Sequence, residues 1–455
     1  MTIKKILIAN RGEIAVRIIR AARELGIETV QVHSDADTES LAVKMADIAV
    51  NIGPAQAAKS YLNTEAILAA AKQHGVDAIH PGYGFFAENA GFADAVEAAG
   101  IAFIGPSGDT IRTMGDKVAA RQAAAAAGVP TVPGSPGRID DMDEARRIAE
   151  ETGFPIMVKA AAGGGGRGIR IVENMEEFNR LAPQASAEAK AAFGDGGLYI
   201  ERLIGNSRHI EVQVLGDGER AVHLFERECS LQRRRQKVWE EAPSATLSRD
   251  VADRMCRASV QLAEAVGYKG AGTVEYLYDD STQEFYFIEM NTRIQVEHPV
   301  SEFITGIDLI REMIRIAGGG KLTMSQDDIS LNGHAIEVRI NAEDPSKDFL
   351  PFPGIVSAVT MPGGPGVRFD GMIYPGYAIP PFYDSLLGKL IVWDTDRTAA
   401  INRMKRALDE FQIEGVTTTK PLFKALANDD KVRAGAFDTK WLEGWLANNA
   451  AQLTD

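Results

Sequence analysis

The chain has 455 residues, enough for about three domains at roughly 100–200 residues each. Hydrophobic residues make up 45% of the sequence and charged residues 25%, which excludes disordered, collagenous and low-complexity proteins. The net charge of −14 argues against general nucleic-acid binding. Cys229 and Cys256 are the only cysteines, no long apolar stretch occurs, and the first residues do not resemble a signal peptide. We therefore expect a cytoplasmic protein without disulfides or membrane spans.

The first hundred residues are predicted to alternate between strands and helices. Residues 5–9 (KILIA) form a short apolar run that is typical of a buried parallel strand. A helix should follow, with Ile14, Ile18, Ala21 and Leu25 on one stripe and Gly26 at its end. Further strands are expected at 29–32, 77–80 and 102–104. Repeated strand–helix units predict an open, doubly wound parallel sheet.

The next region has a different character. An alanine-rich helix is predicted at 118–127, and a loop rich in proline and glycine at 130–137 marks a plausible boundary. Strands at 155–159 and 168–172 flank a run of four glycines, which predicts a hairpin. Backbone N–H groups of such a loop, with Lys159 before it and Arg167 within it, suit a polyphosphate. The alternative is a surface hairpin without a ligand.

Residues 289–297 are the strongest single signal. Five polar side chains alternate with apolar ones, after an apolar run at 285–288 that predicts a buried strand rather than a solvated edge. Glu289 and Asn291 offer oxygen ligands on one side, and Glu275 could add a second carboxylate, a set that suits Mg²⁺ or Mn²⁺ shared with phosphate. Arg293 offers a fork for an oxyanion, and Glu297 could take a proton. Because the segment is long for one site, we expect a bend between Asn291 and Glu297.

Two further segments carry candidate site residues. His209, Glu211 and Gln213 alternate with apolar residues and should share one face of a strand. Residues 227–241 combine five lysines and arginines with several carboxylates, which indicates either a solvated face or part of the site. Mixed strand and turn should follow residue 335, then a helix near 398–410 and a last helix with Trp441 and Trp445.

Six strings together resemble biotin carboxylase, the ATP-grasp component of biotin-dependent carboxylases. They are IANRGEIAVRI at 8–18, HPGYGFFAEN at 80–89, MGDK at 114–117, GGGGRG at 163–168, RECSLQRRRQK at 227–237 and EMNTRIQVEHPV at 289–300. The resemblance runs from about residue 3 to 446. It implies an α/β and α+β protein with a doubly wound pre-ATP-grasp domain at 1–115, an ATP-grasp domain at 116–334 and a mixed β C-terminal domain at 335–447. A mobile lid at about 135–203 is also implied.

The resemblance also implies a set of site residues. The implied nucleotide-binding residues are Lys117, Lys159, Gly163, Gly164, Gly165, Gly166, Glu201, His209 and Gln236. The implied metal ligands are Glu275, Glu289 and Asn291. The implied bicarbonate site consists of Lys237, Arg293, Gln295 and Val296. Glu297 matches the base that deprotonates bicarbonate, Arg339 the residue that stabilises the biotin enolate, and Tyr83 a biotin contact.

The implied reaction uses ATP and Mg²⁺ or Mn²⁺ to form carboxyphosphate from bicarbonate, and the resulting CO₂ is transferred to biotin. No biotin-attachment sequence occurs, so biotin should arrive on a carrier protein or domain, and a further partner should be a carboxyltransferase subunit. A homodimer or a larger carboxylase complex is expected, without nucleic acid or membrane. The final acceptor, whether acetyl-CoA, another acyl-CoA, pyruvate or another 2-oxoacid, is decided by the partner.

Two other functions remain open from the residues. The first is another ATP-grasp ligase, such as half of a carbamoyl-phosphate-type synthetase, and the second is a nucleotide-binding scaffold without catalysis. Three positions depart from the common family pattern. Arg235 stands where histidine is frequent, Trp239 where a smaller residue is frequent, and Ala162 where the lid usually has its first glycine.

Overall fold

The structure is a computed structural model that describes residues 2–160, 169–193 and 196–454. The chain forms two compact units. The first comprises Met1–Val129, Arg208–Tyr276 and Glu289–Asp455, and the second comprises Pro130–Ser207 and Leu277–Ile288. Among the described helices, none has the length and apolar character needed to cross a bilayer.

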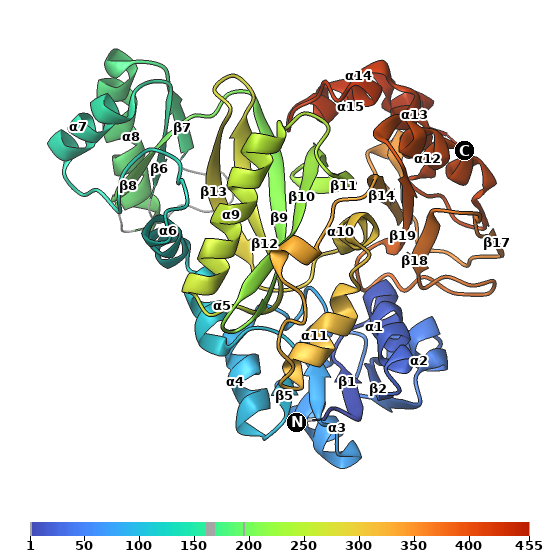
Figure 1. Ribbon diagram of the computed structural model, residues 1–455. Helices are drawn as coiled ribbons and strands as arrows, with labels where there is room; N and C mark the ends of the chain where they lie inside the picture. The colour runs from blue at the N-terminus through green and yellow to red at the C-terminus, as the bar shows by residue number, and fades with distance from the viewer. Residues whose placement is uncertain (1, 161–168, 194–195, 455) are drawn as a thin grey trace. The chain divides into compact units, whose positions relative to one another are not determined.

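The N-terminal part of the first unit is a five-stranded parallel sheet with helices on both faces (Figure 1). Its strand order is β3-β2-β1-β4-β5. Alternate residues of β1 face opposite sides: Ile6 and Ile8 pack with α1, whereas Leu7 packs with residues of α3 and α4. This arrangement confirms the predicted doubly wound sheet. The elements are β1 (Lys5–Ile8), α1 (Gly12–Glu24), β2 (Glu28–His33), α2 (Leu41–Met45), β3 (Ile48–Asn51), α3 (Thr64–His74), β4 (Ala78–His80), α4 (Ala90–Ala98), β5 (Ala102–Phe103), α5 (Gly108–Gly115) and α6 (Lys117–Ala126).

An eight-stranded sheet carries most of the polar residues singled out above. Its order is β13-β12-β9-β10-β11-β14-β19-β18. Strands β14, β19 and β18 continue the sheet formed by the other five strands. The expected domain boundary near residue 335 therefore falls within one sheet, and it remains a prediction. The elements are β9 (Ser207–Asp217), β10 (Ala221–Arg233), β11 (Gln236–Ala242), α9 (Arg249–Ala265), β12 (Lys269–Asp279), β13 (Glu284–Asn291), α10 (His298–Thr305), α11 (Leu309–Ala317), β14 (His334–Asn341), β18 (Val367–Gly371) and β19 (Leu386–Asp394).

The expected strand at 289–297 is wrong beyond its first three residues. Strand β13 ends at Asn291, and Glu297 is the residue that precedes helix α10. The expected bend between Asn291 and Glu297 is therefore confirmed. The apolar run at 285–288 is buried at its first three residues only, because Ile288 is 38% exposed.

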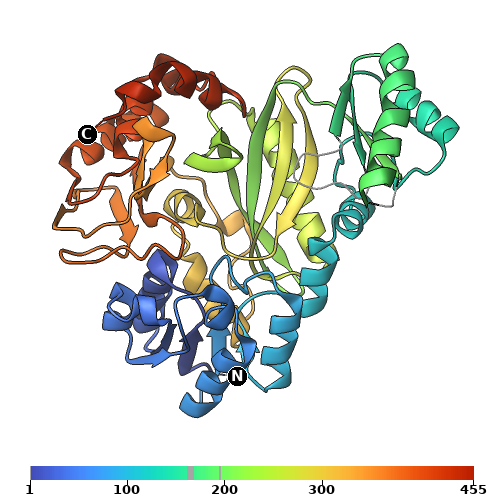
Figure 2. The same cartoon turned by 180° about the vertical axis from the view of Figure 1, so that it is seen from behind.

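The C-terminal helices pack beside β14, β18 and β19, and both views show them in red (Figure 1, Figure 2). The predicted helices near 398–410 and around the two tryptophans are confirmed. The elements are β15 (Glu343–Asp344), β16 (Leu350–Pro351), β17 (Ala358–Thr360), α12 (Arg397–Glu410), β20 (Gln412–Glu414), α13 (Lys420–Asn428), α14 (Asp430–Ala434) and α15 (Trp441–Asn449).

The second unit is built on a three-stranded antiparallel sheet with the order β7-β6-β8. Its strands are β6 (Ile156–Ala160), β7 (Ile169–Val172) and β8 (Leu198–Arg202), and helices α7 (Met142–Thr152) and α8 (Met175–Phe193) cover it. The antiparallel pairing of β6 with β7 confirms the predicted hairpin strands. The connecting glycines, Gly163, Gly164, Gly165 and Gly166, lie outside the described residues, as do Ala162 and Arg167.

Candidate active site

Lys237 lies at the centre of a buried cluster of carboxylates. It follows a tight turn in which Arg234 and Arg235 both adopt positive φ, so the two-residue connection returns the chain directly into β11. Three carboxylates surround its Nζ. The Nζ–oxygen distances are 2.5 Å to Glu211, 2.7 Å to Glu297 and 2.9 Å to Glu275. Burial alone would lower the pKa of Lys237, but the carboxylates outweigh it and raise this pKa well above its usual value.

Glu297 is held between two cations. Its Oε1 accepts from Lys237, and its Oε2 lies 3.0 Å from Arg339 Nη2. Burial would raise the pKa of Glu297, but Lys237 and Arg339 lower it well below its usual value. The carboxylate is therefore ionised at neutral pH.

Arg339 has a second carboxylate partner. Its Nε donates to Glu240 Oε1 at 2.7 Å. Glu240 lies directly across from Glu337 in the pairing of β11 with β14. Burial raises the pKa of Glu240 to about 7, although Arg339 opposes the shift. Neither carboxylate oxygen of Glu337 has a hydrogen-bond partner among the described residues, and burial raises its pKa well above the usual value.

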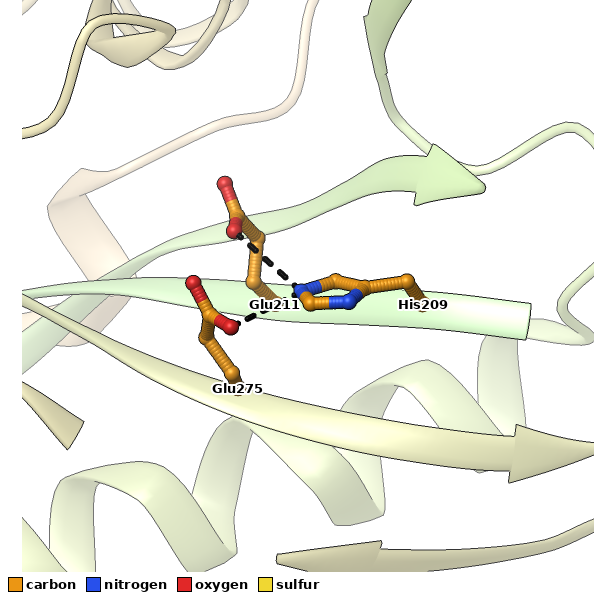
Figure 3. Close-up of side chains that lie close together, drawn as sticks. All are labelled: His209, Glu211 and Glu275. Atoms are coloured by element: carbon orange, nitrogen blue, oxygen red, sulfur yellow. Dashed lines mark ion pairs between the residues drawn. The ribbon is translucent and has the colours of Figure 1, made fainter. Parts of the chain in front are cut away.

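Glu275 joins the candidate metal ligands to the lysine cluster. Asn291 Nδ2 and Gln295 Nε2 each donate to Glu275 Oε1 at 2.9 Å. His209 Nε2 lies 3.0 Å from Glu275 Oε2 and 3.9 Å from Glu211 Oε2 (Figure 3). Donor atoms of His209, Glu211 and Glu275 all lie within 4.8 Å of one another, close enough for one cation. Burial opposes ionisation of Glu275, but Lys237 and His209 lower its pKa.

Arg293 connects this cluster to the N-terminal sheet. Its Nη2 donates to Asn291 Oδ1 at 2.9 Å, and its Nε donates to Glu88 Oε2 at 2.8 Å. Glu88 also accepts from the backbone N–H of Thr292 at 3.1 Å. One carboxylate thus fixes both the side chain of Arg293 and the start of the bend. Glu88 belongs to the string HPGYGFFAEN, but sequence reasoning did not assign it to the site.

Arg227 is a second residue that sequence reasoning did not assign. It is fully buried, and burial would lower its pKa, but Glu211 and Glu297 raise it. Its guanidinium donates to Glu211, Gln213, Thr273, Gln295 and Ser301. The bond to Gln295 Oε1, 2.7 Å long, leaves Gln295 Nε2 to face Glu275. The sequence signal that could have identified Arg227 was the alternation of His209, Glu211 and Gln213. Polar side chains on a buried strand face require buried hydrogen-bond partners.

The expected nucleotide residues are divided between the two units. In the second unit, Lys159 on β6 forms an ion pair with Glu201 on β8. In the first, Lys117 begins α6 after the capping residue Asp116, and Gln236 is exposed at the start of β11. Tyr83 donates its hydroxyl hydrogen to Glu13. Trp239 is 1% exposed and belongs to the same apolar core as Leu231 and Val338, so this departure from the family pattern fills the core.

The sequence is similar to known proteins along the whole chain. Family models match residues 2–111 (biotin carboxylase, N-terminal domain), 116–325 (carbamoyl-phosphate synthase L chain, ATP binding domain) and 337–444 (biotin carboxylase C-terminal domain). Biotin carboxylase 1 of Bacillus subtilis is 54% identical over 442 residues, which cover 97% of this chain and 98% of that protein.

The fold is similar to two solved structures over nearly the full length of each chain. One is the biotin carboxylase subunit of pyruvate carboxylase, with a TM-score of 0.89 at 48% sequence identity, covering 97% of this chain and 98% of that chain. The other is the biotin carboxylase domain dimer of Hydrogenobacter thermophilus 2-oxoglutarate carboxylase in complex with MgADP, ADP and bicarbonate. Its TM-score is 0.88 at 48% sequence identity, with 100% of each chain covered.

Proposed function

The chain belongs to the biotin carboxylase family of ATP-dependent ligases, and we propose that the cluster around Lys237 activates bicarbonate for the carboxylation of biotin. The observation that carries this proposal is the position of Glu297, an ionised carboxylate held between Lys237 and Arg339. Bicarbonate is a weak nucleophile until it loses a proton, and Glu297 is held in the ionised form that can accept one.

The reaction follows from these groups. Lys237, Arg293, Gln295 and Val296 bind bicarbonate, and Glu297 removes its proton. A bicarbonate oxygen attacks the γ-phosphorus of ATP, ADP leaves, and carboxyphosphate forms. Carboxyphosphate breaks down to CO₂ and phosphate, the released phosphate would take the proton of biotin N1, and the nitrogen would add to CO₂. The guanidinium of Arg339 would stabilise the negative charge that develops on the ureido oxygen of biotin, and Tyr83 would be a second contact of biotin.

The remaining site residues bind the nucleotide and its metal. The proposed ATP contacts are Lys117, Lys159, Glu201, His209, Gln236 and the four glycines at 163–166. Glu275, Glu289 and Asn291 would hold Mg²⁺ or Mn²⁺, which neutralises phosphate charge in such reactions. The donor set fits in its chemistry, because all three carry hard oxygens, but Asn291 Oδ1 would have to exchange its hydrogen bond with Arg293 for the metal. Burial and the nearby Glu275 raise the pKa of Glu289, as expected for carboxylates that gather where a cation is needed.

We further propose the following organisation. The chain has three domains, which comprise residues 1–115, 116–334 and 335–447. The second domain carries a mobile lid at about 135–203. Biotin arrives on a carrier protein or domain, a carboxyltransferase subunit uses the product, and the chain forms a homodimer. The dimer in the Hydrogenobacter thermophilus structure supports the last point. The two solved relatives named above come from pyruvate and 2-oxoglutarate carboxylases, so the acceptor is set by the partner. The free, buried thiols of Cys229 and Cys256 support a cytoplasmic location.

One experiment tests the function. The purified chain should hydrolyse ATP slowly without bicarbonate, faster with it, and only with Mg²⁺ or Mn²⁺ present. Free biotin should stimulate the reaction and become labelled from radioactive bicarbonate. ATP hydrolysis that ignores bicarbonate would contradict the proposal. Stimulation by ammonia instead of biotin would favour a carbamoyl-phosphate-type ligase, and the absence of any hydrolysis would favour a scaffold.

A further inference from the structure

Lys389 is a fully buried lysine outside the residues assigned above. It lies on β19 and pairs directly across from Arg339 on β14. A buried ammonium is costly unless charged and polar groups surround it. Its Nζ donates to the backbone carbonyl of Val296 at 2.5 Å and lies 3.3 Å from Glu13 Oε1. Lys389 therefore contacts the bend before α10 and the first turn of α1 at once.

The first of these contacts fixes the peptide between Val296 and Glu297. Because a trans peptide is planar, its carbonyl and its N–H point in opposite directions. With the Val296 carbonyl directed at Lys389, the Glu297 N–H must point away from it. The same plane sets where the Cα of Glu297 lies and, through it, the carboxylate between Lys237 and Arg339.

The second contact reaches Tyr83. Glu13 is 2% exposed and accepts the hydroxyl hydrogen of Tyr83. Burial raises the pKa of Glu13, and Lys389 opposes that shift. Without the ammonium, Glu13 would ionise less readily, and its hydrogen bond with Tyr83 would lose the strength that an ionised acceptor gives.

We propose that Lys389 is a positioning residue that holds the bicarbonate-binding bend and the biotin contact Tyr83 in fixed relation to each other. The inference rests on the proposed function and extends it, because it names the group that links the two substrate sites. A single buried cation serves both sites, so its loss should impair the binding of both substrates. ATP binding should be affected least, because Lys389 contacts Val296 and Glu13, which belong to the proposed bicarbonate site and to the support of Tyr83.

The test compares Lys389→Met with Tyr83→Phe and with a matched control. Lys389→Met keeps the length of the side chain and removes the charge. We expect the KM for bicarbonate and the KM for free biotin each to rise about tenfold, because one buried charged hydrogen bond is lost. The KM for ATP should change far less. Tyr83→Phe should raise the KM for biotin. In the double variant the two effects on the biotin KM should be clearly less than multiplicative, because both act through Glu13.

Arg397→Met is the matched control, because Arg397 forms an ion pair with the buried Glu241 away from this network. It should lower the melting temperature without raising either KM. The inference is overturned if Lys389→Met behaves like this control, or if the effects of the Lys389 and Tyr83 substitutions on the KM for biotin simply multiply.

Should Lys389→Met fail to fold, Glu13→Gln provides the second variant. A KM for biotin raised severalfold supports the linkage, and an unchanged KM overturns it. Wild-type hydrolysis that ignores bicarbonate would instead contradict the proposed function itself.

Discussion

Arg339 and Glu297 form a buried ion pair, with 3.0 Å between Nη2 of the arginine and Oε2 of the glutamate. The group proposed to stabilise the biotin enolate is thus also one of two cations that keep the proposed base ionised. The second cation, Lys237, contacts the other oxygen of the same carboxylate. Arg339 is therefore proposed to act directly in the transfer to biotin and only indirectly, through Glu297, in the activation of bicarbonate.

Arg339→Ala should separate the two half-reactions. Transfer to biotin should fall about a hundredfold or more, since losing one electrostatic donor typically costs about 10²–10³ in rate. Bicarbonate-dependent ATP hydrolysis should fall far less, because Lys237 still contacts Glu297. Both rates and the melting temperature are measured on one preparation. Parallel loss of both activities with a lowered melting temperature would falsify the catalytic role.

The same variant should change the pH profile of bicarbonate-dependent ATP hydrolysis. Arg339 lowers the pKa of Glu297, so its removal should raise that pKa. Because the ionised carboxylate of Glu297 is the proposed base, the acid limb of the profile should move to higher pH. Rates recorded from acid to neutral pH in wild type and variant check this. An unmoved acid limb would show that Glu297 is not the titrating base.

Arg227→Met should both destabilise the chain and weaken bicarbonate binding. Removing one partner from a buried charge network typically costs about 3–5 kcal/mol. The change leaves Glu211 unpaired on one side and frees the amide of Gln295 from its fixed orientation. We expect a lower free energy of unfolding in urea and a raised KM for bicarbonate. A stability loss without any change in that KM would limit Arg227 to a structural role.

Glu337→Met should stabilise the protein increasingly as the pH rises. Burial raises the pKa of Glu337; Lys389 offsets part of this shift and Glu240 adds to it. The folded chain therefore keeps a proton that the unfolded chain loses above about pH 4.3, and its stability falls as the pH rises through the raised pKa. The apolar variant lacks this loss, so its advantage in free energy of unfolding over wild type should grow as the pH rises above about 4.3.

Urea unfolding at several pH values measures this difference. The matched control is Glu65→Met, which replaces an exposed glutamate on α3. It gives the effect of the same substitution at an exposed position. A difference for Glu337→Met that stays constant with pH would mean that Glu337 ionises normally in the folded chain.

Arg235→His should change the affinity for ATP more than turnover. Arg235 is exposed in the turn before β11, two residues from Lys237, and it adopts a positive φ that histidine tolerates. We therefore expect an unchanged melting temperature and a KM for ATP altered severalfold. Lower turnover at saturating ATP with an unchanged KM would place Arg235 elsewhere than at the rim of the nucleotide.

Local patterns in the sequence were sufficient for much of the fold. The apolar run at residues 5–9 and the stripe that begins at Ile14 predicted a buried strand and its covering helix, because periodicity reflects burial along one element. The resemblance to biotin carboxylase also implied Lys237, Glu275 and Glu297 as site residues, and the structure brings both glutamates into contact with Lys237. Their proposed roles come from the family resemblance, since no local period relates residues this far apart in the sequence.

Only the tertiary structure decided which charges meet. Glu88 and Arg293 lie 205 positions apart, and Glu13 and Lys389 come from opposite ends of the chain, so no local period relates them. The alternation after Asn291 predicted a continued strand, whereas the chain turns there so that Glu88 can bind both Thr292 and Arg293. Burial explains the difference. A charge inside the protein must find partners wherever the fold supplies them, and those partners are set by packing between distant segments.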